Sequence, residues 1–374
     1  MTHKGTVLLA AGGTGGHIFT AEALAEELLV RGYQPVLVTD QRYEKYAPEE
    51  KKYPVRIIKA ATFSGGLVQR AASLFCIGAG YMQAVKLVKE YKPLLAVGFG
   101  GYPSFPTMLA ARRCKLPTLI HEQNSRLGRV NALLAPKVNA IATSFPEVFG
   151  LEQREKNKVV LTGNPVRPSV RALRTMAYST LDEHSTMHLL IIGGSQGASV
   201  FATVLPEAIR LLPPAHRARL RVDQQCRPQD VETVSEVYEE MAVNADIATF
   251  FSDLPVRLGG AHLVISRAGA STVAELSVAG RPSILVPYPH AKDDHQRSNA
   301  TALEDAEGGW VMPEEAFTPT ALSARLEAFL SHPASLLEAA QKAHAVGRPD
   351  AAQALADLVE QHAGVLSMQQ KEAA

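Results

Sequence analysis

The sequence predicts an α/β protein with two Rossmann-like domains, each built on a parallel sheet. Three observations lead to this prediction. Short apolar runs alternate with helical segments along the chain, as in βαβ units with right-handed crossovers. The alternation occurs twice, and each half begins with an apolar run, a glycine-rich turn and a helix. The length of 374 residues exceeds that of one ordinary domain.

The apolar runs that we expect to form strands are short and rich in Val, Ile and Leu. Those of the first half are TVLLA, PVLVT, LLAVG, PTLIH and AIATS, and those of the second half are HLLIIG, RLRVD, ATFF, HLVIS and PSILVP. Continuous apolar runs are typical of parallel strands with helices on both faces. We therefore expect two doubly wound sheets.

The segment LTGNPVRPSV interrupts this pattern with two prolines and a glycine. We place the domain boundary there, with an N-terminal domain over 1–164 and a C-terminal domain over 165–345. Two helical patterns follow Pro333, separated by a break at GRPD. Because ligands of open α/β sheets bind beyond the carboxyl ends of the strands, we expect the chemistry in a cleft between the domains.

The composition, 46% hydrophobic and 20% charged, is that of a globular protein and excludes a disordered chain. Cys76, Cys114 and Cys226 have no CxxC or Cys/His spacing, so we expect neither a disulfide framework nor a zinc site. A reducing cytoplasm fits this cysteine usage. The N-terminus lacks the arrangement of a signal peptide.

The longest apolar stretch, residues 71–85, is 15 residues long, whereas a membrane span takes about 20, so we predict that it does not span. Residues 1–150 contain 18 Lys and Arg against 10 Asp and Glu, which makes the two parts of the chain +8 and −7. This asymmetry is either ordinary surface charge or a sign that the first half meets an anion, such as a phosphate or an acidic membrane surface. Residues 65–85 are accordingly either a peripheral membrane contact or a buried amphipathic helix.

The first glycine loop, GGTGGH, ends on His17. Glycines after a strand let a ligand approach the backbone, and the following helix N-terminus attracts anions. The alternative is a tight βα turn without a ligand. The spelling is neither GxGxxG nor GxxxxGK[ST], although Asp40 closes the second strand as a ribose-binding acid of an NAD enzyme would. His17 is a candidate base or phosphate ligand, or else a solvated polar residue.

Two further loops, VGFGGYPSFP and LIHEQNSRLG, each follow an apolar run of the first half. His121, Glu122 and Asn124 stand together on the second of these loops. A dense polar set after a buried strand suits a hydroxyl-rich substrate better than a core.

The most informative stretch of the second half is HLVISRAGASTVAELSVAGRPSILVPYP. We expect a strand ending at Ser266, a turn, and a helix that starts at Ser271 or Thr272 and stops at Gly280. Glu275 then falls in about the first turn of that helix, where a carboxylate can bind a ribose diol while the amides hold a diphosphate. An acid that simply suits the helix dipole is the alternative.

With these residues assembled, the sequence resembles the MurG family of peptidoglycan glycosyltransferases. The motifs GGTGGH, FGGYPS, HEQN, GNPVR, GGSQGA and RAGASTVAE carry the resemblance, and they occur in the family's order over nearly the whole chain. The resemblance implies a GT-B fold and inverting transfer of N-acetylglucosamine (GlcNAc) from UDP-GlcNAc to the 4-hydroxyl of lipid I, undecaprenyl-pyrophosphoryl-MurNAc-pentapeptide, which yields lipid II. It also implies that the last helix, within 346–374, packs back on the N-terminal domain.

On the donor side the resemblance implies binding by residues of the second half and of GNPVR. Ser195 would contact the phosphates, Arg167 the nucleoside, Phe251 the uracil through its backbone, Glu275 the ribose and Gln296 the GlcNAc hydroxyls. The diphosphate and sugar would be lined by the motif residues Arg267, Ala270, Ser271, Thr272, Val273 and Ala274.

On the acceptor side the resemblance implies that the pyrophosphate of lipid I meets Thr14, Gly15 and Gly16. The polar positions that the family uses in the cleft are matched by His17, Tyr102, His121, Glu122, Asn124 and Asn131. His17 and Glu122 are the two candidates for the base, and the sequence does not rank them.

The sequence has no DxD triplet, so we expect metal-independent stabilisation of the leaving group and no cofactor. The expected partners are the two substrates, the anionic inner leaflet, and cell-wall synthesis or division proteins, with no nucleic acid. The expected location is peripheral, on the cytoplasmic face of the bacterial inner membrane. Two other classes stay open, an epimerase or NAD-dependent enzyme and a non-catalytic UDP-sugar-binding regulator.

Overall fold

The computed structural model describes residues 3–12, 15–45, 51–61, 66–182, 184–194 and 198–372. The chain divides into two compact units. The first unit consists of Met1–Arg167 with Asp350–Ala374, and the second unit of Pro168–Pro349. Our predicted domains were 1–164 with 346–374, and 165–345.

The first unit contains a seven-stranded sheet of order β3-β2-β1-β4-β5-β6-β7 within the described residues, and its neighbouring strands pair in parallel. Its strands are β1 (Thr6–Ala10), β2 (Gln34–Thr39), β3 (Val55–Ile57), β4 (Leu95–Gly98), β5 (Thr118–Glu122), β6 (Ala140–Thr143) and β7 (Val159–Leu161). Its α-helices are α1 (Gly15–Val30), α2 (Leu67–Tyr91), α3 (Ser104–Arg113), α4 (Arg129–Leu134), α5 (Gln153–Lys156) and α15 (Ala351–Glu372), with short 3-10 helices η1 (Gln41–Lys45) and η2 (Ala135–Lys137).

The second unit contains a six-stranded parallel sheet of order β10-β9-β8-β11-β12-β13, again within the described residues. Its strands are β8 (Met187–Ile192), β9 (Leu220–Gln225), β10 (Asn244–Ala248), β11 (Leu263–Ser266), β12 (Ser283–Leu285) and β13 (Gly309–Val311). Its α-helices are α6 (Pro168–Arg171), α7 (Ser199–Leu211), α8 (Pro214–Arg217), α9 (Val231–Glu240), α10 (Leu254–Gly260), α11 (Ala270–Ala279), α12 (His295–Asp305), α13 (Pro319–Ser331) and α14 (Ala334–Val346), with 3-10 helices η3 (Ala172–Thr175), η4 (Pro228–Asp230) and η5 (Lys292–Asp294).

The central strand β1 shows why the first unit needs helices on both faces. Successive side chains of a strand point to opposite faces. Val7 and Leu9 belong to one buried cluster, and Leu8 and Ala10 belong to another. Every residue of β1 is buried, so neither face is left to solvent.

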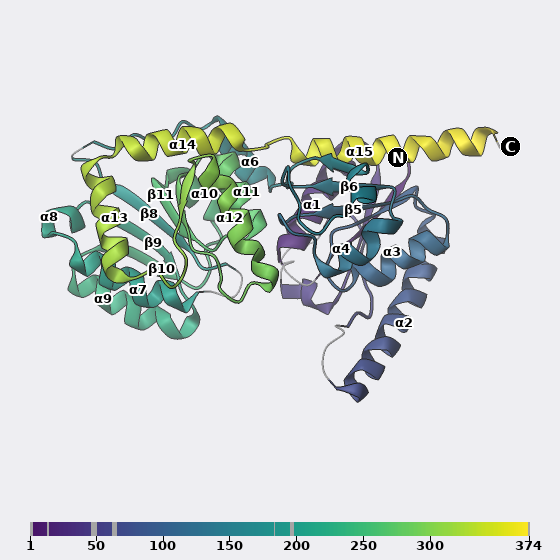
Figure 1. Ribbon diagram of the computed structural model, residues 1–374, viewed down its shortest axis with the longest axis horizontal. Helices are drawn as coiled ribbons and strands as arrows, with labels where there is room; N and C mark the ends of the chain where they lie inside the picture. Colours follow the sequence, from purple (N-terminus) through teal and green to yellow (C-terminus); the bar gives the residue numbers. More distant parts are fainter. Residues whose placement is uncertain are drawn as a thin grey trace. The chain divides into compact units, whose positions relative to one another are not determined.

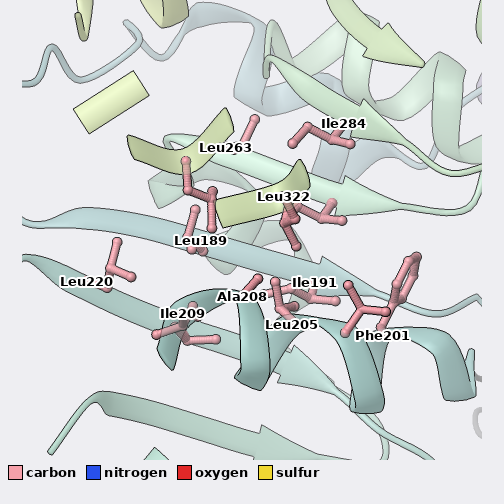
Figure 2. Close-up of a cluster of buried hydrophobic side chains, with 14 of the residues drawn as sticks. Leu189, Ile191, Phe201, Leu205, Ala208, Ile209, Leu220, Leu263, Ile284 and Leu322 are labelled. Atoms are coloured by element: carbon pink, nitrogen blue, oxygen red, sulfur yellow. The ribbon is translucent and has the colours of Figure 1, made fainter. Parts of the chain in front are cut away.

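The second unit repeats this arrangement around β8. Leu189 and Ile191 face a core that also takes Phe201, Leu205 and other side chains from α7 (Figure 2). Leu190 belongs to the cluster on the opposite face. The predicted α/β class with parallel sheets is therefore confirmed.

The last helix, α15, packs on α1 of the first unit (Figure 1). Leu355 and Val359 are fully buried in the cluster that contains Val7. On the same contact Arg31, which directly follows α1, lies 2.6 Å from Asp357 and 2.8 Å from Glu360. The chain therefore leaves the first unit after Arg167 and returns to it at Asp350.

The structure differs from the predicted elements in two places. The run ATFF was expected to be a strand, but β10 covers Asn244–Ala248 and ends where that run begins. Phe251 is instead buried in a loop that leads to α10. Helix α11 begins at Ala270, before the predicted start at Ser271 or Thr272, which puts Glu275 in its second turn; its first turn holds no acid.

One helix within the described residues is long and apolar enough to cross a membrane by length and composition. It spans Gln69–Tyr91, its best window has a mean hydropathy of 1.4, and 28% of that window is buried. Our prediction that this stretch is too short is wrong on length, because α2 continues past Lys86. Leu87 and Val88 in this continuation are buried in the core of the first unit.

Candidate functional site

The carboxyl ends of β1, β4 and β5 are aligned at one edge of the first sheet. Ala10 pairs with Gly98, and Gly98 pairs with Ile120. The loops that follow these three strands therefore start side by side, as parallel strands of similar length require. The motifs GGTGGH, FGGYPS and HEQN lie at these strand ends. His121 and Glu122, which we expected on the loop, are the last two residues of β5.

Two of these loops contact each other through glycines. Gly101 has φ +76°, and a Cβ there would lie 2.0 Å from the carbonyl oxygen of Gly12. Gly100 has φ +84°, and a Cβ there would lie 3.3 Å from His17 Cε1 and 3.6 Å from Asn131 Nδ2. Only glycine fits at position 101, and His17 and Asn131 both lie next to position 100.

The predicted pyrophosphate contacts at the first loop fall partly outside the described residues. Thr14 lies outside them, whereas Gly15 and Gly16 are the first two residues of α1. His17 follows in the first turn of the same helix.

The His17 ring is connected to a buried polar chain. His17 Nδ1 lies 2.8 Å from Gln123 Oε1, and Gln123 Nε2 lies 3.0 Å from His121 Nδ1. His121 Nε2 in turn lies 2.9 Å from the carbonyl oxygen of Gly163. Burial lowers the pKa of His121 to about 4, so this ring is neutral at physiological pH. The structure thus brings His17 and His121 together, and it adds Gln123, which the sequence did not single out.

Glu122, the other candidate base, is buried and accepts several hydrogen bonds. Oε2 accepts from Asn131 Nδ2 at 2.8 Å and from the Gly128 amide at 2.9 Å. Oε1 accepts from the amide of Asn124 at 3.1 Å and from its side chain at 3.2 Å. The carboxylate therefore fastens the start of α4 to the loop after β5.

Asn131 has one buried atom of particular interest. Its Nδ2 donates to Glu122 and to the carbonyl of His121. Its Oδ1 is buried and has no hydrogen-bond partner within the described part of the chain. Such an acceptor is costly unless a water or a ligand hydroxyl satisfies it.

Tyr102 and Asp40 share a neighbour. The guanidinium of Arg42 lies 5.9 Å from the Tyr102 ring centre, and Tyr102 is 37% exposed. The same Arg42 donates through Nε to both carboxylate oxygens of Asp40, at 3.1 and 3.0 Å. The acid that an NAD-dependent enzyme would need for a ribose is therefore engaged by arginine.

The GNPVR segment packs on α1. Thr20 Oγ1 lies 3.0 Å from Asn164 Oδ1, and the Arg167 guanidinium lies 5.6 Å from the Phe19 ring centre. Arg167 is thus placed by the first unit, whereas we assigned it to the second domain.

In the second unit the predicted donor residues gather on α11, whose N-cap is Gly269. Ala270 and Val273 are buried, while Ser271, Thr272, Ala274 and Glu275 are half-buried. The Ser271 hydroxyl is buried without a hydrogen-bond partner among the described residues. Ser195 lies outside the residues that the structure describes.

Arg267 precedes this helix and is held on several sides. It forms an ion pair with Glu314 and donates to the carbonyls of Val286 and Pro287 at 3.2 and 3.3 Å. Its guanidinium also lies 5.4 Å from the Tyr288 ring centre. Arg267 therefore fastens the loop after β12, a role that sequence reasoning missed because its partners are distant in the chain.

The remaining predicted donor residues also have contacts. Gln296 Oε1 accepts from the Tyr288 amide at 2.9 Å, so it orders the same loop as Arg267. Phe251 is 6% exposed, and the Arg257 guanidinium stacks 4.1 Å from its ring centre. Asn299 of α12 donates to the carbonyl of Ala268 at 3.2 Å. No group of three or more metal-ligating side chains is found among the described residues.

Comparison with known proteins gives matches in both units. Residues 7–143 match the glycosyltransferase family 28 N-terminal domain, and residues 188–355 match the glycosyltransferase family 28 C-terminal domain. Among solved structures, the crystal structure of Acinetobacter baumannii MurG is similar with a TM-score of 0.77 and 30% identity, covering 96% of this chain and 99% of that one.

Curated relatives match over nearly their whole length. The UDP-N-acetylglucosamine--N-acetylmuramyl-(pentapeptide) pyrophosphoryl-undecaprenol N-acetylglucosamine transferase of Rhodospirillum centenum is 50% identical, over 96% of this chain and 95% of its own. The protein of the same name from Rhodospirillum rubrum is 51% identical, over 94% and 91%. The chain therefore belongs to glycosyltransferase family 28, within the MurG family of these N-acetylglucosamine transferases.

Proposed function

We propose that this chain transfers GlcNAc from UDP-GlcNAc to the 4-hydroxyl of MurNAc in lipid I, giving lipid II and UDP. The observation that carries the proposal is the identity of about one half, over nearly the full length of both chains, to relatives with this name. The site residues of both units add chemical support, as follows.

The acceptor chemistry rests on the first unit. His17 and Asn131 flank Gly100, and Asn131 Oδ1 is a buried acceptor without a partner in the described chain. A sugar hydroxyl at this place finds a hydrogen-bond acceptor and an imidazole that can take its proton. We assign His17 as the base, because the carboxylate of Glu122 is already used by Asn131, Gly128 and Asn124.

The reaction is a single displacement with inversion. The 4-oxygen of MurNAc forms a bond to C1 of GlcNAc as its proton passes to His17. The bond between C1 and the β-phosphate oxygen breaks, and its electron pair leaves with UDP. The N-terminal amides of α11 and the buried Ser271 hydroxyl are the groups that stabilise this growing negative charge without a metal.

The lipid carrier of the acceptor requires contact with a membrane, and α2 supplies a suitable surface. Leu74, Phe75 and Met82 are 58%, 77% and 65% exposed on this helix. Exposed Arg70 and Lys86 flank this apolar stretch. An apolar helix face with flanking cations suits an anionic leaflet. Because the C-terminal part of α2 is buried in the first unit, we propose peripheral attachment at the cytoplasmic face of the inner membrane.

Labelled transfer tests the proposal. The protein is incubated with UDP-[14C]GlcNAc and a short-chain lipid I analogue in excess EDTA, with UDP-GalNAc as the competing donor. A labelled disaccharide product that survives EDTA is expected. Clear UDP binding by calorimetry without any product would contradict the transferase and favour a regulator that binds UDP-sugar.

A further inference from the structure

Gln123 lies between two imidazole rings of the first unit. Its Oε1 is 2.8 Å from His17 Nδ1, and its Nε2 is 3.0 Å from His121 Nδ1. Gln123 is 2% exposed and His121 is fully buried. The amide therefore connects the half-buried His17 ring to a ring that solvent does not reach.

Two backbone carbonyls fix the direction of every hydrogen bond between His17, Gln123 and His121, because a carbonyl oxygen only accepts. The Gly163 carbonyl, 2.9 Å from His121 Nε2, requires the proton of the neutral His121 ring on Nε2. His121 Nδ1 then carries a lone pair and accepts. The His121 carbonyl lies 3.2 Å from Gln123 Nε2, which requires the NH₂ end of the amide on that side.

The other end of the Gln123 amide is consequently its oxygen, which faces His17 Nδ1. An oxygen without a hydrogen accepts, so His17 Nδ1 must carry a proton. A neutral imidazole has one N–H, and the lone pair then lies on Nε2.

We propose that Gln123 is a positioning residue that holds neutral His17 in the Nδ1–H tautomer and so makes Nε2 the nitrogen that takes the proton of the acceptor hydroxyl. This inference deepens the function proposed above and rests on it for its catalytic part. No proton needs to pass through Gln123 to His121. The hydroxyl proton moves to Nε2 of His17, and the hydrogen bond from Nδ1–H to Gln123 persists in the imidazolium. The carbonyl dipole of Gln123 then faces the new positive charge and favours it.

The tautomer itself is measured by nitrogen-15 NMR of the histidine side chains at about pH 8, where an ordinary imidazole is neutral. The His17 signals are identified by their absence in His17→Ala. The expected spectrum shows the proton of His17 on Nδ1 in the native protein and a majority on Nε2 in Gln123→Met. A native protein with the His17 proton on Nε2, or a variant with an unchanged tautomer, would overturn the proposal.

Two substitutions at Gln123 separate the hydrogen bond from mere packing. Gln123→Met keeps the length of the side chain but offers no acceptor to His17. Gln123→Glu keeps an acceptor oxygen toward His17 whether or not its carboxyl is protonated. We expect Gln123→Met to lower kcat by about 10- to 100-fold with the KM for UDP-GlcNAc unchanged. We expect Gln123→Glu to retain the Nδ1–H tautomer and to keep most of the turnover that Gln123→Met loses. Equal losses in the two variants would contradict the role of the acceptor.

A double-mutant cycle tests whether Gln123 acts through His17. In a His17→Ala background Gln123→Met should lower kcat no further, whereas an undiminished second loss would show an independent structural effect and overturn the proposal. If the native protein shows the Nδ1–H tautomer but transfers no GlcNAc, the proposed function fails and the catalytic role of Gln123 is overturned with it. If the native protein transfers GlcNAc with the other tautomer, only the present inference fails.

Discussion

The side-chain amide of Asn131 donates to Glu122 Oε2 at 2.8 Å, and both residues are at least 98% buried. The same carboxylate also receives the Gly128 amide and two hydrogen bonds from Asn124. This arrangement uses Glu122 to order the loop after β5. It leaves His17 as the better candidate for proton transfer.

Glu122→Gln should therefore act mainly on stability. The substitution places an NH₂ group against N–H donors and removes charge-assisted hydrogen bonds, each worth about 1.5–3 kcal/mol. We expect the free energy of unfolding to fall by about 2 kcal/mol or more, as measured by urea denaturation. Glu147→Gln, at an exposed position of the same unit, serves as the control and should change it by no more than about 0.5 kcal/mol. Full stability of Glu122→Gln together with abolished turnover would instead identify Glu122 as the base.

The second unit should lose stability in mild acid because of His262. Burial lowers the pKa of His262 to about 4, and its Nδ1 accepts from the His188 amide at 3.0 Å. In the unfolded chain the pKa is about 6.5, so between these values the unfolded state binds more protons. The stabilisation is therefore complete above about pH 6.5 and is lost as the pH falls toward 4, at a cost of up to about 3 kcal/mol.

Urea denaturation at pH 8 and pH 5, followed by the single tryptophan Trp310 in β13, measures this effect in the second unit. His262→Gln should reduce the pH dependence, whereas the exposed His332→Gln should leave it unchanged. An identical pH dependence in all three proteins would show that His262 does not titrate as its burial requires.

Membrane attachment should depend on α2. Leu74→Ser with Phe75→Ser removes two exposed apolar side chains, so we expect little loss of stability and at least a tenfold loss of binding to vesicles that contain an anionic lipid. Val256→Ser, at a 73% exposed position of the second unit, is the matched control. Sedimentation at low and high salt separates the apolar from the electrostatic part. Retained vesicle binding by the double variant would show that the membrane contact does not lie on α2.

UDP binding should depend on Glu314, a residue outside the predicted contact set. Glu314 forms an ion pair with Arg267, which also holds the carbonyls of Val286 and Pro287. Glu314→Gln should weaken UDP binding in calorimetry several-fold by loosening this loop. The substitution leaves the guanidinium of Arg267 without its ionic partner, and this costs more free energy than the loss of a partner by a neutral group. The exposed pair Glu307 and Lys342 of the same unit provides the control variant Glu307→Gln. Unchanged UDP affinity in Glu314→Gln would separate Arg267 from donor binding.

The central strands could be predicted from the sequence, and the edge strands could not. β1, β8 and β11 are mostly apolar on both faces, which is the pattern that the sequence shows plainly. β5 is fully buried and has apolar Leu119 and Ile120 on its two faces, although it ends in His121 and Glu122. β3 and β7 at the sheet edges have only three residues each and are partly exposed, so they lack this signal. The strand prediction for ATFF is wrong because Phe251 lies in a loop and is buried in a hydrophobic cluster of the second unit and against Arg257, not in the sheet.

The site shows a similar division. His17, Gly100 and Asn131 could be expected to meet, because each lies in a segment that follows one of three neighbouring parallel strands. Gln123 could not be ranked above its neighbours in HEQN, since its role depends on where His121 and the Gly163 carbonyl lie in space. The pairing of Arg267 with Glu314 likewise depends on residues distant in sequence that the fold brings together.

The most direct test of the account is the rate of GlcNAc transfer to a short-chain lipid I analogue in EDTA, compared between the native protein and His17→Ala. Loss of a general base predicts a 10²- to 10⁴-fold lower kcat in His17→Ala, at about unchanged UDP affinity. Product from the native protein together with this loss would support the assignment of His17 at the edge formed by β1, β4 and β5. Native turnover in His17→Ala, or UDP binding without any transfer by the native protein, would contradict it.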